Sequence, residues 1–272
     1  MQKKSLEISC YVIGAGAFGV FLRWLQDQLA FDDNGLAEPS VFHVLVPLFI
    51  LASAFVFMRF VDHFRAKRFY ASDNFNAALI NEGRLYTVLR WAAGIIMSLG
   101  GVLLFMSCEV DKYPGMLRIL SLLGLLAGIS FPLLLGAANK GPRIPATLCA
   151  LSVFPILLFA FWLIVSYKAN DINSVVWSFG IEIVCIIVSM LAYFRMAGFA
   201  FGTPNVGRSM FYCMLGSALC VMTVADERYM GMQLMFFGAA VQMVLYNWIL
   251  IKNLQQKKAQ AETPLEDGFE RL

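Results

Sequence analysis

The sequence predicts an all-α protein, a polytopic bundle of eight helices that each cross a membrane. Three observations predict this fold: 60% of the 272 residues are hydrophobic, only 14% are charged, and the mean hydropathy is +0.71. Soluble domains average about 45–50% apolar and about 25% charged residues. A chain this apolar fits the class of multi-pass membrane proteins, with the lipid bilayer as its surroundings.

Eight apolar runs are long enough to cross a bilayer as a helix, which takes about 20 residues. We expect a single transmembrane domain over residues 1–272, because no connection is long enough for a soluble domain, and a polar tail over 252–272. Pro47, Pro132 and Pro155 fall inside runs and predict kinks there. In order, the runs cover residues 8–26, 41–61, 85–107, 116–137, 146–167, 174–195, 208–225 and 229–251.

The basic residues predict the orientation of the helices. If the first run starts in the cytoplasm, 15 Lys and Arg residues fall in the inner connections and tails, five fall on the outer side, and Arg90 lies within the third run. Because Lys and Arg favour the cytoplasmic side, this bias predicts that both termini are cytoplasmic. The simplest location is the plasma membrane of a bacterium.

A weak internal similarity predicts two parallel halves of four helices each. The connection "DKYPGM" at residues 111–116 matches "ERYMGM" at 227–232, and the halves would cover 1–140 and 141–251. Each half starts on the inner side, as in transporters built from parallel repeats. The rival interpretation is convergence, because every such protein needs basic inner ends and tight outer turns.

Small residues predict where helices pack closely within the membrane, where lipid offers no hydrophobic driving force between helices. Gly124 and Gly128 form a G-x-x-x-G pattern in the fourth run, and further glycines lie in the first, third and eighth runs. We therefore expect the first, third, fourth and eighth helices to be central.

One carboxylate lies deep in an apolar run. Glu182 is eight residues inside the sixth run, about 12 Å below its outer end at 1.5 Å per residue. A charge at such a depth is costly against lipid. Ser178, Glu182, Cys185 and Ser189 follow one another at spacings of four, three and four residues. This spacing predicts one polar stripe that faces the bundle interior or a cavity.

The charge partner of Glu182 is left open by the sequence. Arg90 and Arg23 are the candidate cations, and Gln242 in the eighth run is a neutral alternative. Glu182, Ser178, Cys185, Ser189 and Gln242 together predict a substrate or proton pathway. An intramembrane carboxylate that only fixes helix packing remains the alternative.

The patterns of known catalytic and metal sites give no support for an enzyme. The chain has two histidines and no Cys-x-x-Cys, His-Glu-x-x-His or G-x-S-x-G pattern, nor a P-loop. We therefore predict no catalytic residue, no metal and no cofactor. The small net charge of +3 argues against nucleic acid as a partner. The six cysteines are interpreted as small apolar residues of the core.

Two functions remain after these exclusions. The leading prediction is a small secondary transporter or permease with its polar site at Glu182, because duplicated halves and an intramembrane polar site are typical of transporters. The alternative is a non-catalytic membrane partner: an assembly factor, a sensor component, or a subunit of a larger complex. A homo-oligomer also fits the sequence.

Overall fold

The computed structural model of the chain describes residues 2–31, 38–67, 69–70, 75–108, 113–140, 146–170, 176–226 and 228–256. It confirms an almost entirely helical protein with eight helices that are long and apolar enough to span a membrane. The long helices are α1 (Gln2–Leu29), α2 (Phe42–Ala66), α4 (Arg84–Ser107), α5 (Pro114–Ala137), α7 (Val153–Ala169), α8 (Val176–Ala200), α9 (Val206–Thr223) and α10 (Met230–Lys252).

The fifth predicted span is broken into two helices. A short helix, α6 (Ala146–Ala150), precedes α7, and the two are joined by turns at residues 151–152. Pro155 lies in the first turn of α7, not at a kink inside a long helix. Proline has no N–H to bond Leu151, and its ring crowds that carbonyl, so the helix interrupts there. Pro47 and Pro132 lie inside the continuous helices α2 and α5.

Short elements close the end of the bundle where α1 begins and α10 ends. The strands β1 (Phe69–Tyr70) and β2 (Gln255–Gln256) pair antiparallel, so the start of the polar tail is ordered against the chain. The Asn253 amide donates to the carbonyls of Ala78 and Ile80, each at 2.9 Å. Ala78 belongs to the short helix α3 (Phe75–Leu79). The connection between α2 and α4 is therefore tied to α10.

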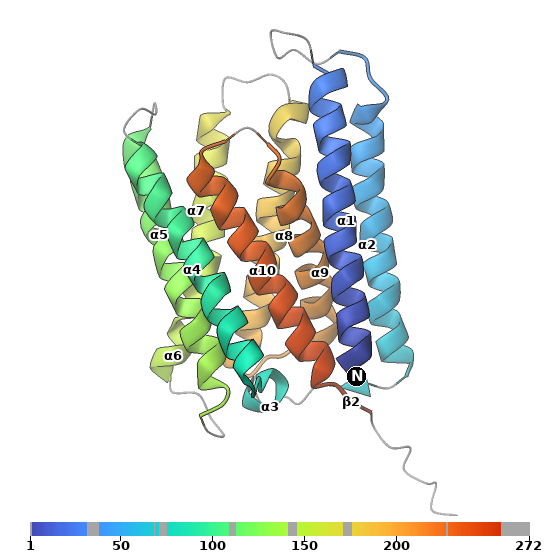
Figure 1. Cartoon of the computed structure of the whole chain (residues 1–272), viewed down its shortest axis with the longest axis vertical. Coiled ribbons are helices and arrows are strands. Elements are labelled where there is room, and N and C mark those ends of the chain that lie inside the picture. Colours follow the sequence, from blue (N-terminus) through green and yellow to red (C-terminus); the bar gives the residue numbers. More distant parts are fainter. Residues whose placement is uncertain are drawn as a thin grey trace, which may run out of the picture.

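The centre of the bundle lies elsewhere than predicted. Figure 1 shows α10 crossing the bundle diagonally between the α4–α5 pair and the α1–α2 pair. Within the apolar stretches, 72% of the α10 residues, 67% of α9 and 61% of α5 are buried, against 33% of α1 and α4 and 11% of α2. The prediction was right for α10 and α5, was wrong for α1 and α4, and missed α9. It counted glycines, but α9 uses Ser, Cys, Ala and Met for the same purpose.

Close helix approach at small residues is concentrated around α4. A Cβ on Gly94 would lie 2.6 Å from the Gly128 carbonyl oxygen of α5. A Cβ on Gly124 would overlap the sulfur of Met235, and one on Gly238 would lie 2.8 Å from Cβ of Met97. Backbones this close exclude any side chain between them, so α4 is fixed between α5 and α10.

The stretch "GAGAFG" at residues 14–19 also packs closely. Its glycine spacing is that of a dinucleotide-binding turn, but it lies within α1 and not between a strand and a helix. A Cβ on Gly16 would lie 2.8 Å from Cβ of Val221, and one on Gly19 would lie 3.1 Å from the sulfur of Met222. The stretch is a packing surface for α9.

Both described ends of the chain lie at the same end of the bundle, as an even number of spans requires (Figure 1). The packing around the two predicted halves differs. α4 packs against α5 and α10, whereas its counterpart α9 packs against α1, α2, α8 and α10. The duplication of 1–140 and 141–251 stays a prediction.

Candidate functional site

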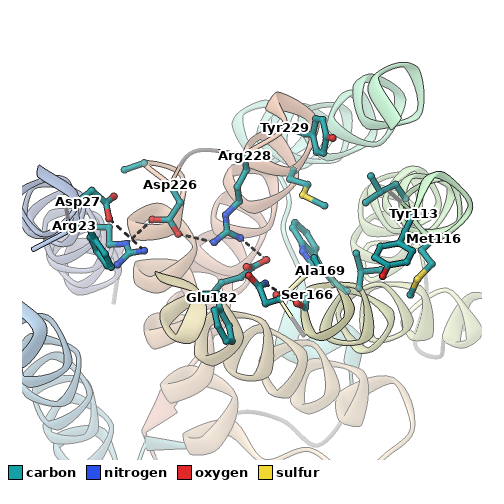
Figure 2. Close-up of a pocket in the computed structure, with 18 of the residues that line it drawn as sticks. Arg23, Asp27, Tyr113, Met116, Ser166, Ala169, Glu182, Asp226, Arg228 and Tyr229 are labelled. Carbon is teal, nitrogen blue, oxygen red and sulfur yellow. Dashed lines mark hydrogen bonds and ion pairs between the residues drawn. The ribbon is translucent and has the colours of Figure 1, made fainter. Parts of the chain in front are cut away.

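A cavity of about 1150 Å³ opens at one end of the bundle. It lies where α1, α7 and α9 end and where α5, α8 and α10 begin, which we call the pocket end; the other end of the bundle is the opposite end. Figure 2 shows charged and aromatic side chains around this cavity. The lining residues are Arg23, Trp24, Asp27, Gln28, Phe31, Tyr113, Met116, Leu117, Trp162, Val165, Ser166, Ala169, Asn170, Phe179, Glu182, Ala225, Asp226, Arg228, Tyr229 and Met232.

Glu182 lines this cavity and is paired with Arg228. The Arg228 guanidinium approaches the Glu182 carboxylate at 2.5 Å, and both side chains are largely buried, with 12% and 9% of their surface exposed. Arg228 comes from the connection between α9 and α10 and reaches down to α8. Ser166 of α7 lies beside the same carboxylate (Figure 2). The predicted partners Arg90, Arg23 and Gln242 are therefore replaced by a cation from a connecting segment.

The ion pair continues into a chain of alternating charges. The second guanidinium nitrogen of Arg228 contacts Asp226 at 2.9 Å. Asp226 in turn accepts from Nε of Arg23 at 2.8 Å, and Arg23 also lies 3.7 Å from Asp27 on α1. Glu182, Arg228, Asp226, Arg23 and Asp27 form what we call the charge network (Figure 2). Arg23 thus joins the site one step away from Glu182.

The network extends across α1 to α2. Arg23 donates to Oε1 of Gln26 at 2.7 Å, so the Gln26 amide nitrogen faces Nδ1 of His43 at 3.1 Å. An amide nitrogen can only donate, so Nδ1 accepts and the ring proton sits on Nε2, which lies 3.1 Å from the Glu38 carbonyl. Gln26 therefore links Arg23 on α1 to His43 on α2.

Glu182 lies six residues after Val176, the first described residue of α8, which corresponds to about 9 Å along the axis at 1.5 Å per residue. The carboxylate therefore lies on the half of α8 that is nearer to the pocket end, where the side chain of Arg228 reaches it.

Below Glu182, the polar stripe of α8 faces α9. The Cys185 sulfur lies 3.5 Å from that of Cys220 and 3.7 Å from the Thr223 hydroxyl. Ser189 lies 3.2 Å from the Cys220 sulfur. Cys185 and Ser189 point into the bundle and are fully buried. The side chain of Ser178, the first residue of the predicted stripe, lies outside the described residues.

Gln242 belongs to a separate contact deeper in the bundle. Its Oε1 accepts from the Tyr193 hydroxyl at 2.8 Å, and its amide nitrogen lies 3.1 Å from the Met97 sulfur. Tyr193 is eleven residues further along α8 than Glu182. Gln242 therefore joins α8, α10 and α4 but does not lie in the cavity.

Aromatic side chains close the bottom of the cavity. Trp162 is fully buried, stacks on Phe159 with ring centroids 5.8 Å apart, and packs against Phe236 at 4.2 Å. Phe159 also stacks on Tyr193. These rings and the Cys185–Cys220 pair separate the cavity from the opposite end of the bundle.

Arg90 lies at the opposite end, away from the cavity. Its guanidinium donates to the Asn81 side chain at 3.3 Å and lies against Gly136 of α5. Asn139 bonds the backbone and the side chain of Asn81. Arg90 therefore anchors the α3–α4 connection onto α5 and has no part in the Glu182 site.

Sequence reasoning missed Arg228, Asp226 and Trp162. Arg228 and Asp226 belong to a short connection, where charged residues are ordinary. One signal was available: this connection carries three consecutive charges, Asp226 to Arg228, directly after the shortest apolar run. No signal marked Trp162 among the other aromatic residues.

Comparisons of the chain with protein-family models, with curated proteins and with solved structures found no significant match. The class of the protein therefore follows from its fold alone. Its described residues form eight helices that are long and apolar enough to cross a membrane, as in a multi-pass membrane protein, with a charged cavity at one end. Within the described residues, no three His, Cys, Asp or Glu side chains gather to hold a metal ion.

Proposed function

We propose that this protein is a small secondary transporter, and that the structure corresponds to its state open at the pocket end. The observation that carries the proposal is a cavity of about 1150 Å³ at the pocket end that is lined by Glu182. Pockets that hold small molecules have volumes of about 300–1,000 Å³. A water-filled approach to an intramembrane carboxylate is typical of substrate and proton pathways.

In this proposal Glu182 couples the substrate to protons. Its carboxylate is held by Arg228, which is itself shared with Asp226. A substrate or proton that binds the Glu182 carboxylate would displace Arg228, which would then pair with Asp226 alone. The link between α8 and the start of α10 would become weaker as a result. The barrier below the site is the α8–α9 contact at Cys185 and Cys220. Transport would require this contact to open toward the opposite end.

The pocket end is proposed to face the outside of the cell. The connections at the opposite end carry most of the Lys and Arg residues, which favour the cytoplasm. With this orientation, both termini are cytoplasmic, and the plasma membrane of a bacterium is the simplest location. Substrate would then bind from outside.

Two native cysteines can test the proposal. Cys10, Cys108, Cys149 and Cys213 are replaced by Ser or Ala, which leaves Cys185 and Cys220, both fully buried. Membrane vesicles of each orientation are then treated with a charged methanethiosulfonate reagent, with and without a proton gradient. A transporter exposes this pair to the opposite side in its other state, so reaction is expected from that side only.

The control in the same background is Lys140→Cys, because residue 140 is exposed at the opposite end. It must react from the opposite side in the same vesicles. If Lys140→Cys reacts and the native pair never does, the barrier does not open and the transporter proposal fails. Glu182→Gln is the second variant: loss of the gradient dependence is expected if the carboxylate carries the proton.

The alternative of a partner protein has weaker support. A groove of about 700 Å³ runs between α1 and α2, and Gly14 has open space where a side chain would lie. Apart from Glu7, Tyr11 and Ser53, its lining is apolar. Lipid acyl chains fill such a groove as well as a protein helix does. The groove therefore gives no preference for a protein partner.

A further inference from the structure

The basic side chains of the two bundle ends differ in their surroundings. At the pocket end, Arg23 and Arg228 are each held by carboxylates of the charge network. At the opposite end, none of the Lys and Arg side chains that the structure describes takes part in an ion pair. The positive charges of the opposite end are therefore available to a negatively charged ligand.

Three arginines lie around the start of α9, which packs between α2 and α8 at this end. A Cβ on Gly207 would lie 4.0 Å from a guanidinium nitrogen of Arg65, which belongs to α2. On the other side, the Ser209 hydroxyl donates to the backbone carbonyl of Arg195 on α8 at 3.3 Å. Arg208 stands between Gly207 and Ser209 in the first turn of α9. We call Arg65, Arg195 and Arg208 the arginine cluster.

The charges of the arginine cluster are not compensated by the described parts of the chain. Arg65 and Arg208 are exposed, and Arg195 is partly exposed. Asp62 lies one turn before Arg65 on α2 but forms no ion pair with it. Because an arginine side chain stays protonated in proteins, three like charges from three helices meet here and repel one another. An anion bound among them would remove this repulsion.

Exposed apolar side chains adjoin the arginine cluster on the membrane side. Met58 lies two turns from Arg65 toward the pocket end, on the same face of α2, and is 50% exposed. Phe194 is 54% exposed, and its ring centre lies 5.7 Å from the guanidinium carbon of Arg195. Both α2 and α8 therefore present a positive charge near the helix end and an apolar surface beside it.

An anionic phospholipid is complementary to this surface, because it carries a phosphate group directly above its acyl chains. Arginine binds phosphate through pairs of parallel N–H donors, and basic sites between membrane helices bind anionic lipid headgroups. A soluble anion could use the guanidiniums but would leave the apolar surface without a ligand. The charge and the apolar surface together favour a lipid.

We propose that the arginine cluster binds the phosphate group of an anionic phospholipid, whose acyl chains lie along Met58 and Phe194. The bound headgroup holds the end of α2 to α8 and α9. This link matters most for α2, because only 11% of its apolar stretch is buried. The site lies at the opposite end from the cavity and does not depend on transport, so the two proposals can fail separately.

Two phospholipids that differ only in the headgroup test the proposal. Phosphatidylglycerol is anionic and phosphatidylcholine has no net charge, and both are used with the same acyl chains. Their binding to the purified full-length protein in a neutral detergent is measured by native mass spectrometry. We expect the first phosphatidylglycerol to bind at least about tenfold more tightly than the first phosphatidylcholine, which corresponds to about 1.4 kcal/mol.

Two triple variants locate the charges that are responsible. The first combines Arg65→Gln, Arg195→Gln and Arg208→Gln and should lose the preference for phosphatidylglycerol. The control removes the same number of charges from exposed residues elsewhere at the opposite end, with Gln in place of Lys4, Arg84 and Lys140. It should keep the preference. Gel filtration checks that both variants are folded, and the double variant of the exposed Arg65 and Arg208 should by itself lose most of the preference.

Three results would overturn the proposal. Equal binding of the two lipids to the wild type would mean that the headgroup charge is not recognised. An equal loss of preference in both triple variants would mean that the lipid responds to the overall positive charge of the opposite end and not to the arginine cluster. Displacement of phosphatidylglycerol by millimolar inorganic phosphate would mean that the cluster is a site for free phosphate and not for a lipid.

Discussion

Two regions of the bundle hold their helices together in different ways. At the pocket end, α1, α8 and the α9–α10 connection are linked by long charged side chains, from Asp27 through Arg23, Asp226 and Arg228 to Glu182. In the body of the bundle, α4 touches α5 and α10 through backbone at Gly94, Gly128 and Gly238. Two charged side chains that meet between helices keep the helices about two side-chain lengths apart, so space remains between them. Glycines bring the helix backbones into contact and leave no such space.

This difference explains why the cavity lies at the pocket end. A membrane bundle of small residues packs into a solid core, as it does below Trp162. A hollow needs side chains that hold the helices apart and still satisfy one another. The charge network does both, so we expect its members to be more important for stability than surface charges usually are.

The largest effect should come from Asp226→Ala. Asp226 is buried and holds both Arg23 and Arg228, so its removal leaves two largely buried guanidiniums short of one carboxylate. Breaking a buried ion pair in this way costs about 3–5 kcal/mol. Thermal unfolding in detergent should show a large loss of stability. An unchanged unfolding temperature would show that the network does not hold the pocket end together.

A smaller loss is expected from Gly128→Ala in the packed region. The new Cβ would lie 2.7 Å from the Gly94 carbonyl oxygen and from the Ser98 amide nitrogen, and would overlap the Ser98 hydroxyl. Because backbone cannot move aside cheaply, overpacking should cost about 1–3 kcal/mol.

Gly14→Ala is the matched control, since nothing lies within 4 Å of its Cβ position. Alanine favours helix over glycine, so this variant should unfold at the same or a slightly higher temperature. Equal destabilisation by the two substitutions would contradict the close approach of α4 and α5.

Tyr193→Phe should have a modest effect. It removes the hydrogen bond from the Tyr193 hydroxyl to Gln242 but keeps the ring that stacks on Phe159. Hydrogen bonds between membrane helices contribute about 0.6 kcal/mol on average and up to about 1.7. The unfolding temperature is compared with that of Tyr212→Phe, whose hydroxyl is outside this contact. A loss of stability as large as that for Asp226→Ala would show that the polar contact in the core contributes as much to stability as the charge network at the pocket end.

The smallest effect on stability is expected from Asp27→Asn. Its carboxylate is partly exposed, and its contact with Arg23 is long; exposed pairs contribute about 1 kcal/mol or less. The variant should fold as the wild type does, as judged by unfolding temperature and by gel filtration. A strong destabilisation would mean that Asp27 contributes to the stability of the pocket end as Asp226 does.

The number and order of the spans could be predicted because crossing a membrane demands long apolar runs, and these are visible in any sequence. The stripe of Cys185 and Ser189 was also predictable, because a helix places residues at spacings of three and four on one face. Helix ends were less certain: α1 and α8 each extend several residues beyond their predicted runs, since a helix can continue through polar residues outside the apolar region.

The cavity and the partner of Glu182 could not be predicted. Both depend on which helices are neighbours, and apolar runs carry no information on neighbours. The predicted cations, Arg23 and Arg90, lie within apolar runs, whereas Arg228 enters from a connection. The central position of α9 was missed because its small residues are mostly not glycines. The cavity itself results from five separate segments that meet at one end.

In the proposed structure-to-function relation, water reaches the Glu182 site from the pocket end and not from the opposite end. Ser166→Cys, in a background with all six native cysteines replaced by Ser or Ala, places a thiol beside Glu182 (Figure 2). Sealed vesicles of each orientation are treated with a charged methanethiosulfonate reagent at a low temperature that slows conformational exchange. The account predicts rapid modification from the pocket end and much slower modification from the opposite end. Equal rates from both sides, or no modification from the pocket end, would contradict it.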